Sequence, residues 1–325
     1  MSMGVVRKAV ITAAGRGTRQ FPATRALQKE LMPLVDRDGI AKPTIQIIIE
    51  ECLASGIEDI AIVVEKGGEG PFREHFSRLT DPERQVFKSK DWAMKQAEML
   101  ERIEGSVTYV EQPAPEGYGH AVYQTKEFVN GEPFLLLLGD HVYISGSEKR
   151  CAQQVIDTYS LAQCAVSSVQ QTPDDHLNLF GTVTGKRLGQ ADPPTYEVSA
   201  IYEKPTIEYA AEHLQTEGVK RGYYLCFFGM HIFPSSIFDC LEEHIVNNWR
   251  EKGEIQLTSS QELLRQRERY VAVETVGERL DMGVPLGYIE TQMALALSSI
   301  DREEVLATLL RHVARSAGAN PFGRL

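Results

Sequence analysis

The sequence predicts an α/β protein with a Rossmann-like, doubly wound mixed sheet that is mostly parallel. Three observations support this fold class: short apolar runs typical of buried strands, helical patterns that alternate with them, and turn residues at the junctions. The chain has 325 residues, of which 42% are hydrophobic, so it is long enough to bury a large core.

The predicted elements follow one another in βαβ order. The expected strands are 8–14, 59–64, 106–112 and 133–140. The expected helices are 43–56, which ends at Gly56, 91–105, and the crossover segment 117–129. A polar stretch from about 66 to 105 interrupts the pattern, but no internal repeat or low-complexity linker is visible. This organisation favours one doubly wound domain over two independent domains.

The stretch AVITAAGRGTR at 9–19 indicates a loop that binds phosphate. Gly15 and Gly17 lack Cβ atoms, so their backbone can take positive φ and bring its N–H groups close to an anion. Residues 1–29 hold six Lys and Arg and no Asp or Glu, although the formal net charge of the whole chain is -11. This concentration of positive charge predicts a nucleoside triphosphate as the ligand.

Two common phosphate motifs do not fit this loop. The dinucleotide fingerprint GxGxxG is broken because Gln20 takes the place of its third glycine and Pro22 follows, so we expect an extended loop after Gly17. The Walker-like GTVTGKR at 181–187 has the wrong spacing and ends in Arg187. A GxG turn after a strand is often purely structural, but the adjoining cations favour a functional interpretation.

Composition argues against several classes of protein. The apolar run FLLLL at 134–138 is far shorter than the roughly 20 residues of a membrane span, and no signal-like apolar region follows the basic N-terminus. We therefore expect a cytoplasmic protein with no membrane partner. The five cysteines never form CxxC and are expected to be buried thiols. A pI of about 5.3 argues against a nucleic-acid partner.

Polar residues follow the expected strands at the sheet edge where ligands bind in this fold class. Gly15, Gln112 and Asp140 each come at the carboxyl end of a strand. A carboxylate at Asp140 could bind Mg²⁺ that bridges phosphate oxygens. The alternatives are a turn cap or a glycosyltransferase DxD motif, but His141 and Val142 follow Asp140, so the second carboxylate of DxD is missing. The phosphate loop at the same edge favours metal binding.

Together these residues resemble the bacterial UTP-glucose-1-phosphate uridylyltransferases, which are sugar-nucleotide pyrophosphorylases. AAGRGTRQFPATRALQKELMPLVD at 13–36 follows the family pattern GxGTRxxPATKxxxKExLPxVD, and EQPAPEGYGHAV at 111–122 follows its base-binding segment. The later matching motifs, in order, are LLGD (137–140), FGTV (180–183), YEKP (202–205), GMHIFPSSIFDCLEE (229–243), GEIQLT (253–258) and RLDMGVPLGY (279–288). Several co-linear motifs across about residues 8–296 are far more specific than any one of them.

The resemblance implies a fold of the nucleotide-diphospho-sugar transferase type, with a catalytic domain at 1–296 and a C-terminal helical extension at 297–325. It implies transfer of a uridylyl group from UTP to glucose 1-phosphate by Mg²⁺-assisted in-line attack on the α-phosphorus. The attacking phosphate is already anionic, so catalysis should rest on positioning and positive charge. The alternatives are the same reaction with dTTP, CTP or another hexose 1-phosphate, and a regulator that binds sugar nucleotides without turnover.

The resemblance also implies roles for individual residues. The catalytic residues would be Arg19, Lys29, Asp140 and Lys204. The nucleotide-binding residues would be Ala14, Gly15, Gly17, Thr18, Gln112 and Gly117. Gly181, Glu203 and Lys204 would bind the sugar phosphate, and Asp140 with Asp281 would hold Mg²⁺. The alternative for Glu203 and Lys204 is a solvated pair before Pro205, and His120 and His141 are expected to be structural.

Some features depart from the family pattern or lie outside it. Residues 37–41 look inserted, Thr12 replaces a Pro, His141 replaces a second acid, and Phe180 replaces a Tyr. These departures leave the exact sugar and base open. The segment 301–318 has apolar residues at 305, 309, 310 and 313, the spacing of a one-sided helix. That stripe could pack on its own domain or on a second subunit, and we expect a homo-oligomer, a dimer or a tetramer.

Overall fold

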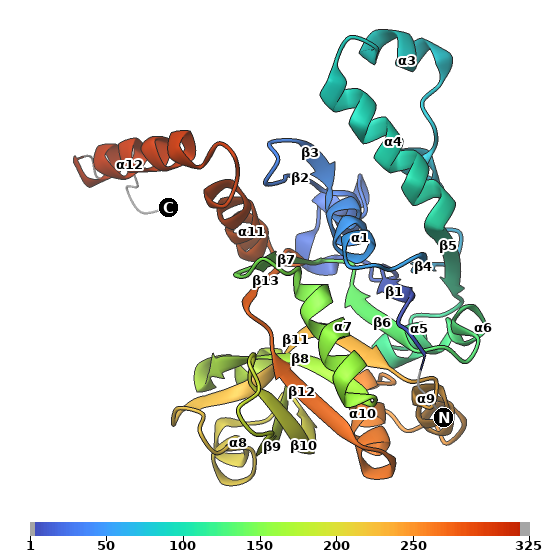
Figure 1. Cartoon of the computed structure of the whole chain (residues 1–325), viewed down its shortest axis with the longest axis vertical. Helices are drawn as coiled ribbons and strands as arrows, with labels where there is room; N and C mark the ends of the chain where they lie inside the picture. The colour runs from blue at the N-terminus through green and yellow to red at the C-terminus, as the bar shows by residue number, and fades with distance from the viewer. Residues whose placement is uncertain (1–3, 319–325) are drawn as a thin grey trace.

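The computed structural model describes residues 4–318, which form a nine-stranded sheet with helices on both faces (Figure 1). The strands lie in the order β5, β4, β1, β6, β11, β8, β12, β10, β9. Their bounds, in that order, are Val107–Gln112, Asp59–Glu65, Lys8–Thr12, Phe134–Leu138, Tyr223–Phe233, Ala165–Pro173, Tyr270–Glu274, Thr195–Glu203 and Gly181–Arg187. The predicted mixed α/β sheet is confirmed.

Parallel pairing is concentrated in the N-terminal half of the sheet. Strands β5, β4, β1 and β6 are mutually parallel, so their carboxyl ends meet at one edge. The long strand β11 pairs antiparallel with both β6 and β8, and antiparallel neighbours make up most of the remaining half. The sheet therefore has a parallel part and a mixed part joined at β11.

Two groups of helices cover the two faces of the sheet. One hydrophobic cluster joins Ala9 and Ile11 of β1 to the first group, and a second cluster joins Val10 to the other group. This alternation is the period of two expected for a strand buried on both faces. The first group is α1 (Thr44–Ala54), α2 (Gly70–Phe76), α4 (Asp91–Ser106) and α7 (Cys151–Ala162). The second group is α5 (Tyr118–Tyr123), α6 (Lys126–Val129), α9 (Ile237–Val246) and α10 (Leu257–Arg267).

The remaining elements lie outside these layers. Two small antiparallel ribbons are formed by β2 (Pro33–Val35) with β3 (Ala41–Pro43) and by β7 (His141–Ser145) with β13 (Gly277–Asp281). The other helices are α3 (Asp81–Phe87), α8 (Ile207–His213), α11 (Pro285–Leu297) and α12 (Arg302–Gly318). In Figure 1, α12 extends away from the sheet beside α11.

Two local predictions need correction. The crossover segment 117–129 is two short helices, α5 and α6, because the Thr125 hydroxyl donates to the carbonyl of Val122 and the chain turns there. The chain after Gly17 is not extended but forms three short 3-10 helices, Thr18–Gln20, Ala23–Arg25 and Lys29–Leu31. Local bonds such as Arg25 N–H to Pro22 O, 3.1 Å, hold these turns, since a proline can begin a turn that it could not continue inside a helix.

Other predictions can be compared directly with the structure. All five cysteines are free and buried, as expected. Among the described residues, none of the helices is both long and apolar enough to cross a bilayer. The expected helix at 301–318 is present as α12, with Leu310 and Val313 exposed, whereas 319–325 of the predicted extension lie outside the described residues. The division into a catalytic domain and an extension stays a prediction.

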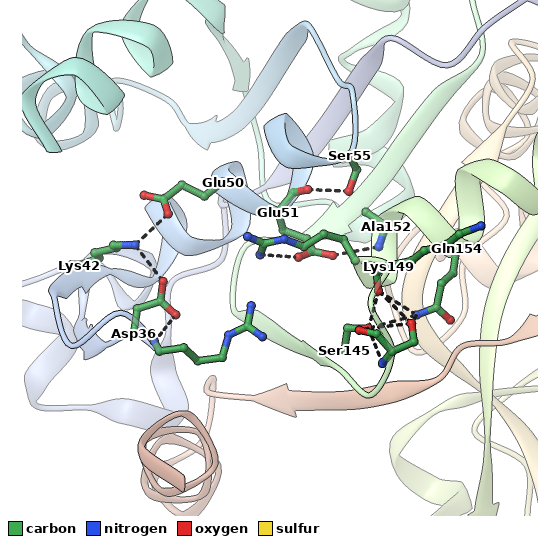
Figure 2. Close-up of polar contacts among 12 residues, drawn as sticks. Asp36, Lys42, Glu50, Glu51, Ser55, Ser145, Lys149, Ala152 and Gln154 are labelled. Carbon is green, nitrogen blue, oxygen red and sulfur yellow. Dashed lines mark hydrogen bonds and ion pairs between the residues drawn. The ribbon is translucent and has the colours of Figure 1, made fainter. Parts of the chain in front are cut away.

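The 37–41 insertion forms the turn of the β2–β3 ribbon and helps to neutralise a buried lysine. The Lys42 side chain is 3% exposed, and its Nζ lies 2.9 Å from Asp36, 2.8 Å from Asp38 and 2.8 Å from Glu50. Figure 2 shows Lys42 between Asp36 and Glu50 of α1. Burial alone would lower the pKa of Lys42, but the three carboxylates raise it above its ordinary value. The inserted Asp38 thus completes an ion cluster that fixes the ribbon to α1.

A second acid of α1 connects that helix to α7. Glu51 accepts a hydrogen bond from Arg150 Nη1 at 3.1 Å and another from the backbone N–H of Ala152 at 3.0 Å (Figure 2). Ala152 lies in the first turn of α7, where N–H groups have no partner within the helix. The two acids on neighbouring positions of α1 therefore hold the ribbon on one side and α7 on the other.

We predict that Lys42→Met destabilises the protein by about 3–5 kcal/mol, because it leaves three carboxylates without their cation. Urea unfolding of both proteins measures this difference. The matched control is Lys149→Met, which removes an exposed ion pair with Asp157 and should change the free energy of unfolding by no more than about 1 kcal/mol. Equal losses in the two variants would contradict the role given to the Lys42 cluster.

A buried histidine lies in the centre of the sheet, on β11. His231 Nδ1 is 2.6 Å from the Ser167 hydroxyl and 3.2 Å from Gln261 Nε2, and its ring stacks on Phe233. Burial lowers the pKa of His231 to about 3. The folded state therefore keeps this ring neutral at pH values where the unfolded chain, with a histidine pKa of about 6.5, takes up a proton.

The depressed pKa of His231 predicts a stability loss in acid. The contribution is complete above about pH 6.5 and is lost as the pH falls toward 3, by up to about 1.4 kcal/mol per pH unit. His231→Gln should flatten the dependence of the free energy of unfolding on pH between 6.5 and 4, whatever it costs at pH 8. His213→Gln, which removes an exposed histidine of α8, should keep the wild-type slope; an unchanged slope in His231→Gln would refute this prediction.

Candidate active site

A cavity of about 560 Å³ opens at the carboxyl edge of the parallel strands. It brings together most of the site residues expected from the sequence: Ala14, Gly15, Arg19, Lys29, Gln112, Gly117, Asp140, Gly181, Glu203, Lys204 and Asp281. Gly17 and Thr18 are not among its lining residues. Gly17 has φ 59°, and its carbonyl accepts a hydrogen bond from the Thr24 hydroxyl at 3.1 Å. Gly17 and Thr18 therefore set the backbone conformation of the loop without lining the cavity.

An ion pair between Lys29 and Asp140 lies at the centre of the cavity. Lys29 Nζ is 2.6 Å from Asp140 Oδ2, and both side chains are largely buried. Burial alone would raise the pKa of Asp140, but the ring of His141 and the cations of Lys29 and Arg19 hold it below its ordinary value. The pKa of Lys29 is raised, because Asp140 and Glu30 outweigh the effect of its burial. Both groups of the pair are therefore charged at neutral pH.

Two glycines allow this ion pair to form. A Cβ on Gly139 would lie 2.7 Å from the carbonyl oxygen of Thr12, so β1 and the end of β6 can approach only because Gly139 has no side chain. The N–H of Gly139 donates to that same carbonyl at 2.9 Å, which places Asp140 next to the loop. A Cβ on Gly15 would lie 3.3 Å from Lys29 Nζ. The loop backbone and the ion pair are thus in direct contact.

Glu30 is a buried acid beneath the ion pair that the sequence interpretation did not place in the site. Its side chain is 1% exposed, neither carboxylate oxygen has a hydrogen-bond partner, and its Oε1 lies 3.6 Å from Lys29 Nζ. Burial raises the pKa of Glu30 to about 8. At neutral pH this carboxyl is therefore mostly protonated and adds little negative charge beneath the phosphate loop.

The β7–β13 ribbon places three potential metal ligands together. Asp140, His141 and Asp281 have ligand atoms within 4.8 Å of one another, and His141 pairs with Asp281 across the ribbon. A Cβ on Gly283 would lie 2.5 Å from Asp140 Oδ2, so the space in front of this carboxylate depends on glycine. Carboxylate oxygens suit Mg²⁺ and an imidazole nitrogen suits other divalent cations, so these residues fit a divalent ion. His141 was expected to be structural, but it lines the cavity.

Gln112 and Gly117 form the side of the cavity assigned to the base. Gln112 Nε2 donates to the carbonyl of Gly117 at 3.1 Å and lies 3.2 Å from His120 Nδ1. Gly117 has φ 118°, and a Cβ there would lie 2.7 Å from the carbonyl oxygen of Ile255, so the segment packs closely on the chain before α10. His120 supports Gln112, in agreement with the structural role expected for it.

Glu203 and Lys204 lie at the end of β10, on the side assigned to the sugar. Glu203 Oε2 accepts a hydrogen bond of 2.6 Å from the Thr258 hydroxyl, and its side chain is 16% exposed. A Cβ on Gly181 would lie 2.6 Å from the ring of Phe227 and 3.3 Å from Glu203 Oε2. Lys204 Nζ is 3.6 Å from Glu203 Oε1 and lines the same cavity. Of the two side chains, Glu203 is largely buried, whereas Lys204 is 41% exposed at the cavity surface.

The cavity contains further residues that the sequence interpretation missed, notably Arg279 and Thr258. Both belong to recognised motifs, RLDMG and GEIQLT, but neither motif shows which of its side chains points into a cavity. For Arg279 there was a signal, because it is a charged residue in RLDMG, the motif that already contributes Asp281. GEIQLT contributed no predicted site residue, so no such signal marked Thr258. Arg279 precedes Asp281 by two positions on β13, so the two share a face of that strand.

Comparison with known proteins agrees with this geometry. Residues 8–298 match the family model of the nucleotidyl transferases. The UTP–glucose-1-phosphate uridylyltransferase of Bacillus subtilis (strain 168) is 34% identical over 318 residues, which cover 95% of this chain and 97% of the relative. The UTP-bound UGPase of Acinetobacter baumannii superposes with a TM-score of 0.75 at 26% identity, covering 94% of this chain and 98% of that one. A UDP-glucose pyrophosphorylase complexed with UDP-glucose gives a TM-score of 0.70 at 26% identity, over 89% and 98% of the chains. The chain therefore belongs to the nucleotidyl transferase family, in the group of the UTP–glucose-1-phosphate uridylyltransferases.

Proposed function

We propose that this protein transfers the uridylyl group of UTP to the phosphate of glucose 1-phosphate and releases UDP-glucose and pyrophosphate. The observation that carries the proposal is the single cavity that holds the phosphate loop, the Lys29–Asp140 ion pair and the Glu203–Lys204 pair. The similar proteins support the choice of substrates, because one relative bears the name of this activity and two solved structures hold UTP and UDP-glucose.

The nucleotide occupies the half of the cavity formed by the parallel strands. Ala14 and Gly15 approach the triphosphate through their backbone, Gly17 and Thr18 set the shape of the loop, and Arg19 neutralises the departing pyrophosphate. Lys29 balances charge at the α-phosphate. Gln112 and the backbone of Gly117 recognise the edge of the uracil, which is why Gln112 is held in place by His120.

The sugar phosphate occupies the half formed by β9 and β10. Gly181 and Glu203 contact sugar hydroxyls, and Lys204 binds the phosphate. An oxygen of that phosphate attacks the α-phosphorus while the bond to the bridging oxygen of the β-phosphate breaks, and pyrophosphate carries the electron pair away. No proton has to be removed from the attacking oxygen, so the residues act by positioning and by opposing the repulsion of two anions.

Asp140 and Asp281 would hold a divalent cation, which we propose to be Mg²⁺. Bound there, the ion would neutralise charge on the phosphate oxygens during transfer. His141 lies beside both carboxylates and could contribute a third ligand. The Lys29 ammonium, 2.6 Å from Asp140, keeps one carboxylate oxygen oriented whether or not an ion is present.

Three finer statements belong to the same proposal. The protein acts in the cytoplasm, has no nucleic-acid or membrane partner, and forms a homo-oligomer, a dimer or a tetramer. The exposed Leu310 and Val313 of α12 support the homo-oligomer, because they could pack against a second subunit. Transfer from another nucleotide, such as dTTP or CTP, or to another hexose 1-phosphate remains the second candidate, because Phe180 and His141 depart from the family pattern next to the site.

The proposed function predicts pyrophosphate release only when UTP, glucose 1-phosphate and Mg²⁺ are present together. A coupled pyrophosphate assay over a grid of nucleoside triphosphates and sugar 1-phosphates measures this, and excess EDTA should lower the rate by at least ~100-fold. If dTTP, CTP or another hexose 1-phosphate gave a higher kcat/KM than UTP with glucose 1-phosphate, that pair of substrates would replace them in the proposed reaction. Binding without release in every combination would reject the enzyme in favour of a regulator.

The assigned residues predict a second result. Asp140→Asn and Lys204→Ala should each lower kcat/KM by ~100- to 1000-fold, equivalent to about 3–4 kcal/mol, because the first weakens the hold on the divalent cation and the second removes a positive charge that opposes the repulsion between the two anions. Lys186→Ala, an exposed lysine of β9 outside the cavity lining, is the control and should keep wild-type activity. Full activity in both site variants, with unchanged thermal stability, would show that the assignment is wrong.

A further inference from the structure

Arg279 lies on the cavity-facing side of the β7–β13 ribbon, where the proposed function gives it no role. On β13 it shares a face with Asp281, and it pairs with Tyr143 of β7 as Asp281 pairs with His141. The ribbon therefore places the cation of Arg279 two residues from the proposed metal ligand Asp281, and both side chains line the cavity.

The guanidinium of Arg279 is held in a fixed orientation. Its Nη1 donates to the carbonyl oxygen of Phe227 at 2.8 Å, and its central carbon lies 3.8 Å from the centroid of the Phe180 ring. Stacking on an aromatic face and donation to a backbone carbonyl leave the planar group little rotational freedom. Arg279 is thus preorganised before any ligand arrives.

This positive charge has no carboxylate partner. Its Nε is buried without a hydrogen-bond partner, and within residues 4–318 no acid forms an ion pair with it. A partly buried cation without a carboxylate partner costs free energy, so its presence in a cavity favours an anionic ligand.

The position of Arg279 indicates which anion it binds. On one side are Phe180 and Phe227, which adjoin the sugar-contacting Gly181. On the other side are Asp281 and His141, beside the metal ligand Asp140. The phosphate of a hexose 1-phosphate must lie between its own sugar and the α-phosphate that it attacks. Arg279 lies between these two sets of residues, whereas Arg19 belongs to the loop after β1 and approaches Asp140 and Asp281 from the side of Gly283.

We propose that Arg279 binds the phosphate of the acceptor sugar 1-phosphate, together with Lys204, and orients its attacking oxygen. The inference rests on the proposed function and adds the residue that fixes the acceptor. Two parallel N–H groups of one guanidinium can hold two oxygens of a phosphate and leave the third directed at the α-phosphorus. Arg279 neither gives nor takes a proton in the transfer.

Arg279→Met tests this assignment through binding, without relying on turnover. Isothermal titration calorimetry should show UDP-glucose, which carries the sugar-linked phosphate, binding at least ~30-fold more weakly, and UTP within about threefold of wild type. The KM for glucose 1-phosphate should rise more than the KM for UTP. Arg279→Lys, which keeps a point charge, should recover part of the UDP-glucose affinity. Arg187→Met, an exposed arginine of β9, is the control and should bind both ligands as wild type does.

A stability measurement separates ligand binding from a structural role. Because its charge is unpaired in the free protein, Arg279→Met should unfold without ligand at the wild-type temperature or above it. A fall of several degrees, an equal loss of UTP affinity, or unchanged UDP-glucose affinity would each overturn the proposal. If the wild-type protein released no pyrophosphate from any substrate pair, the proposed function would fail, whereas the UDP-glucose titrations would still decide the role of Arg279.

Discussion

The Lys29–Asp140 ion pair is the contact on which the geometry of the site depends. It joins the loop after β1 to the end of β6 at a distance of 2.6 Å. Gly139 lets these two segments approach, because a Cβ there would lie 2.7 Å from the carbonyl oxygen of Thr12, and Gly15 leaves additional space beside the ammonium. Glu30, beneath the pair, is largely protonated at neutral pH, so it does not compete with Asp140 for the Lys29 ammonium. The site can therefore keep a charged pair in a largely buried position, while Arg16 and Arg19 of the same loop also line the cavity.

The two parts of the sheet explain how one cavity can receive two anions. The parallel strands converge at one edge and bring the phosphate loop, Gln112 and Asp140 together. Beyond β11, the antiparallel strands carry Gly181 and Glu203 toward the same cavity from the opposite side. The β7–β13 ribbon contributes His141, Arg279 and Asp281 to the same cavity, which is the position that the roles proposed for these residues require.

The sequence predicted those parts of the site that depend on local patterns. A strand followed by GxG and cations, and an Asp directly after four leucines, are recognisable because each motif lies at the end of its own buried strand. His141 and Arg279 could not be found this way, because their surroundings come from the pairing of β7 with β13, which are more than 130 residues apart. Glu30 could not be found because its role comes from its burial. Gly17 and Thr18 belong to the same motif as Gly15 and Arg19, but they do not line the cavity. Pro22 begins tight turns where the sequence predicted an extended loop.

Three of the groups that the sequence did not identify, Glu30, His141 and Arg279, share one physical property: each has a buried polar atom without a hydrogen-bond partner in the free protein. Glu30 has no hydrogen bond to either oxygen, His141 has none to Nδ1, and Arg279 has none to Nε. Unsatisfied groups of this kind reduce stability, so the fold tolerates them only where the surrounding structure holds them firmly. Glu30 lies in the 3-10 helix Lys29–Leu31 and does not line the cavity, whereas His141 and Arg279 lie on the β7–β13 ribbon and do line it. In the role proposed for Arg279, an anionic ligand would pair with its charge, so the cost of the unpaired guanidinium in the free protein favours the filled state.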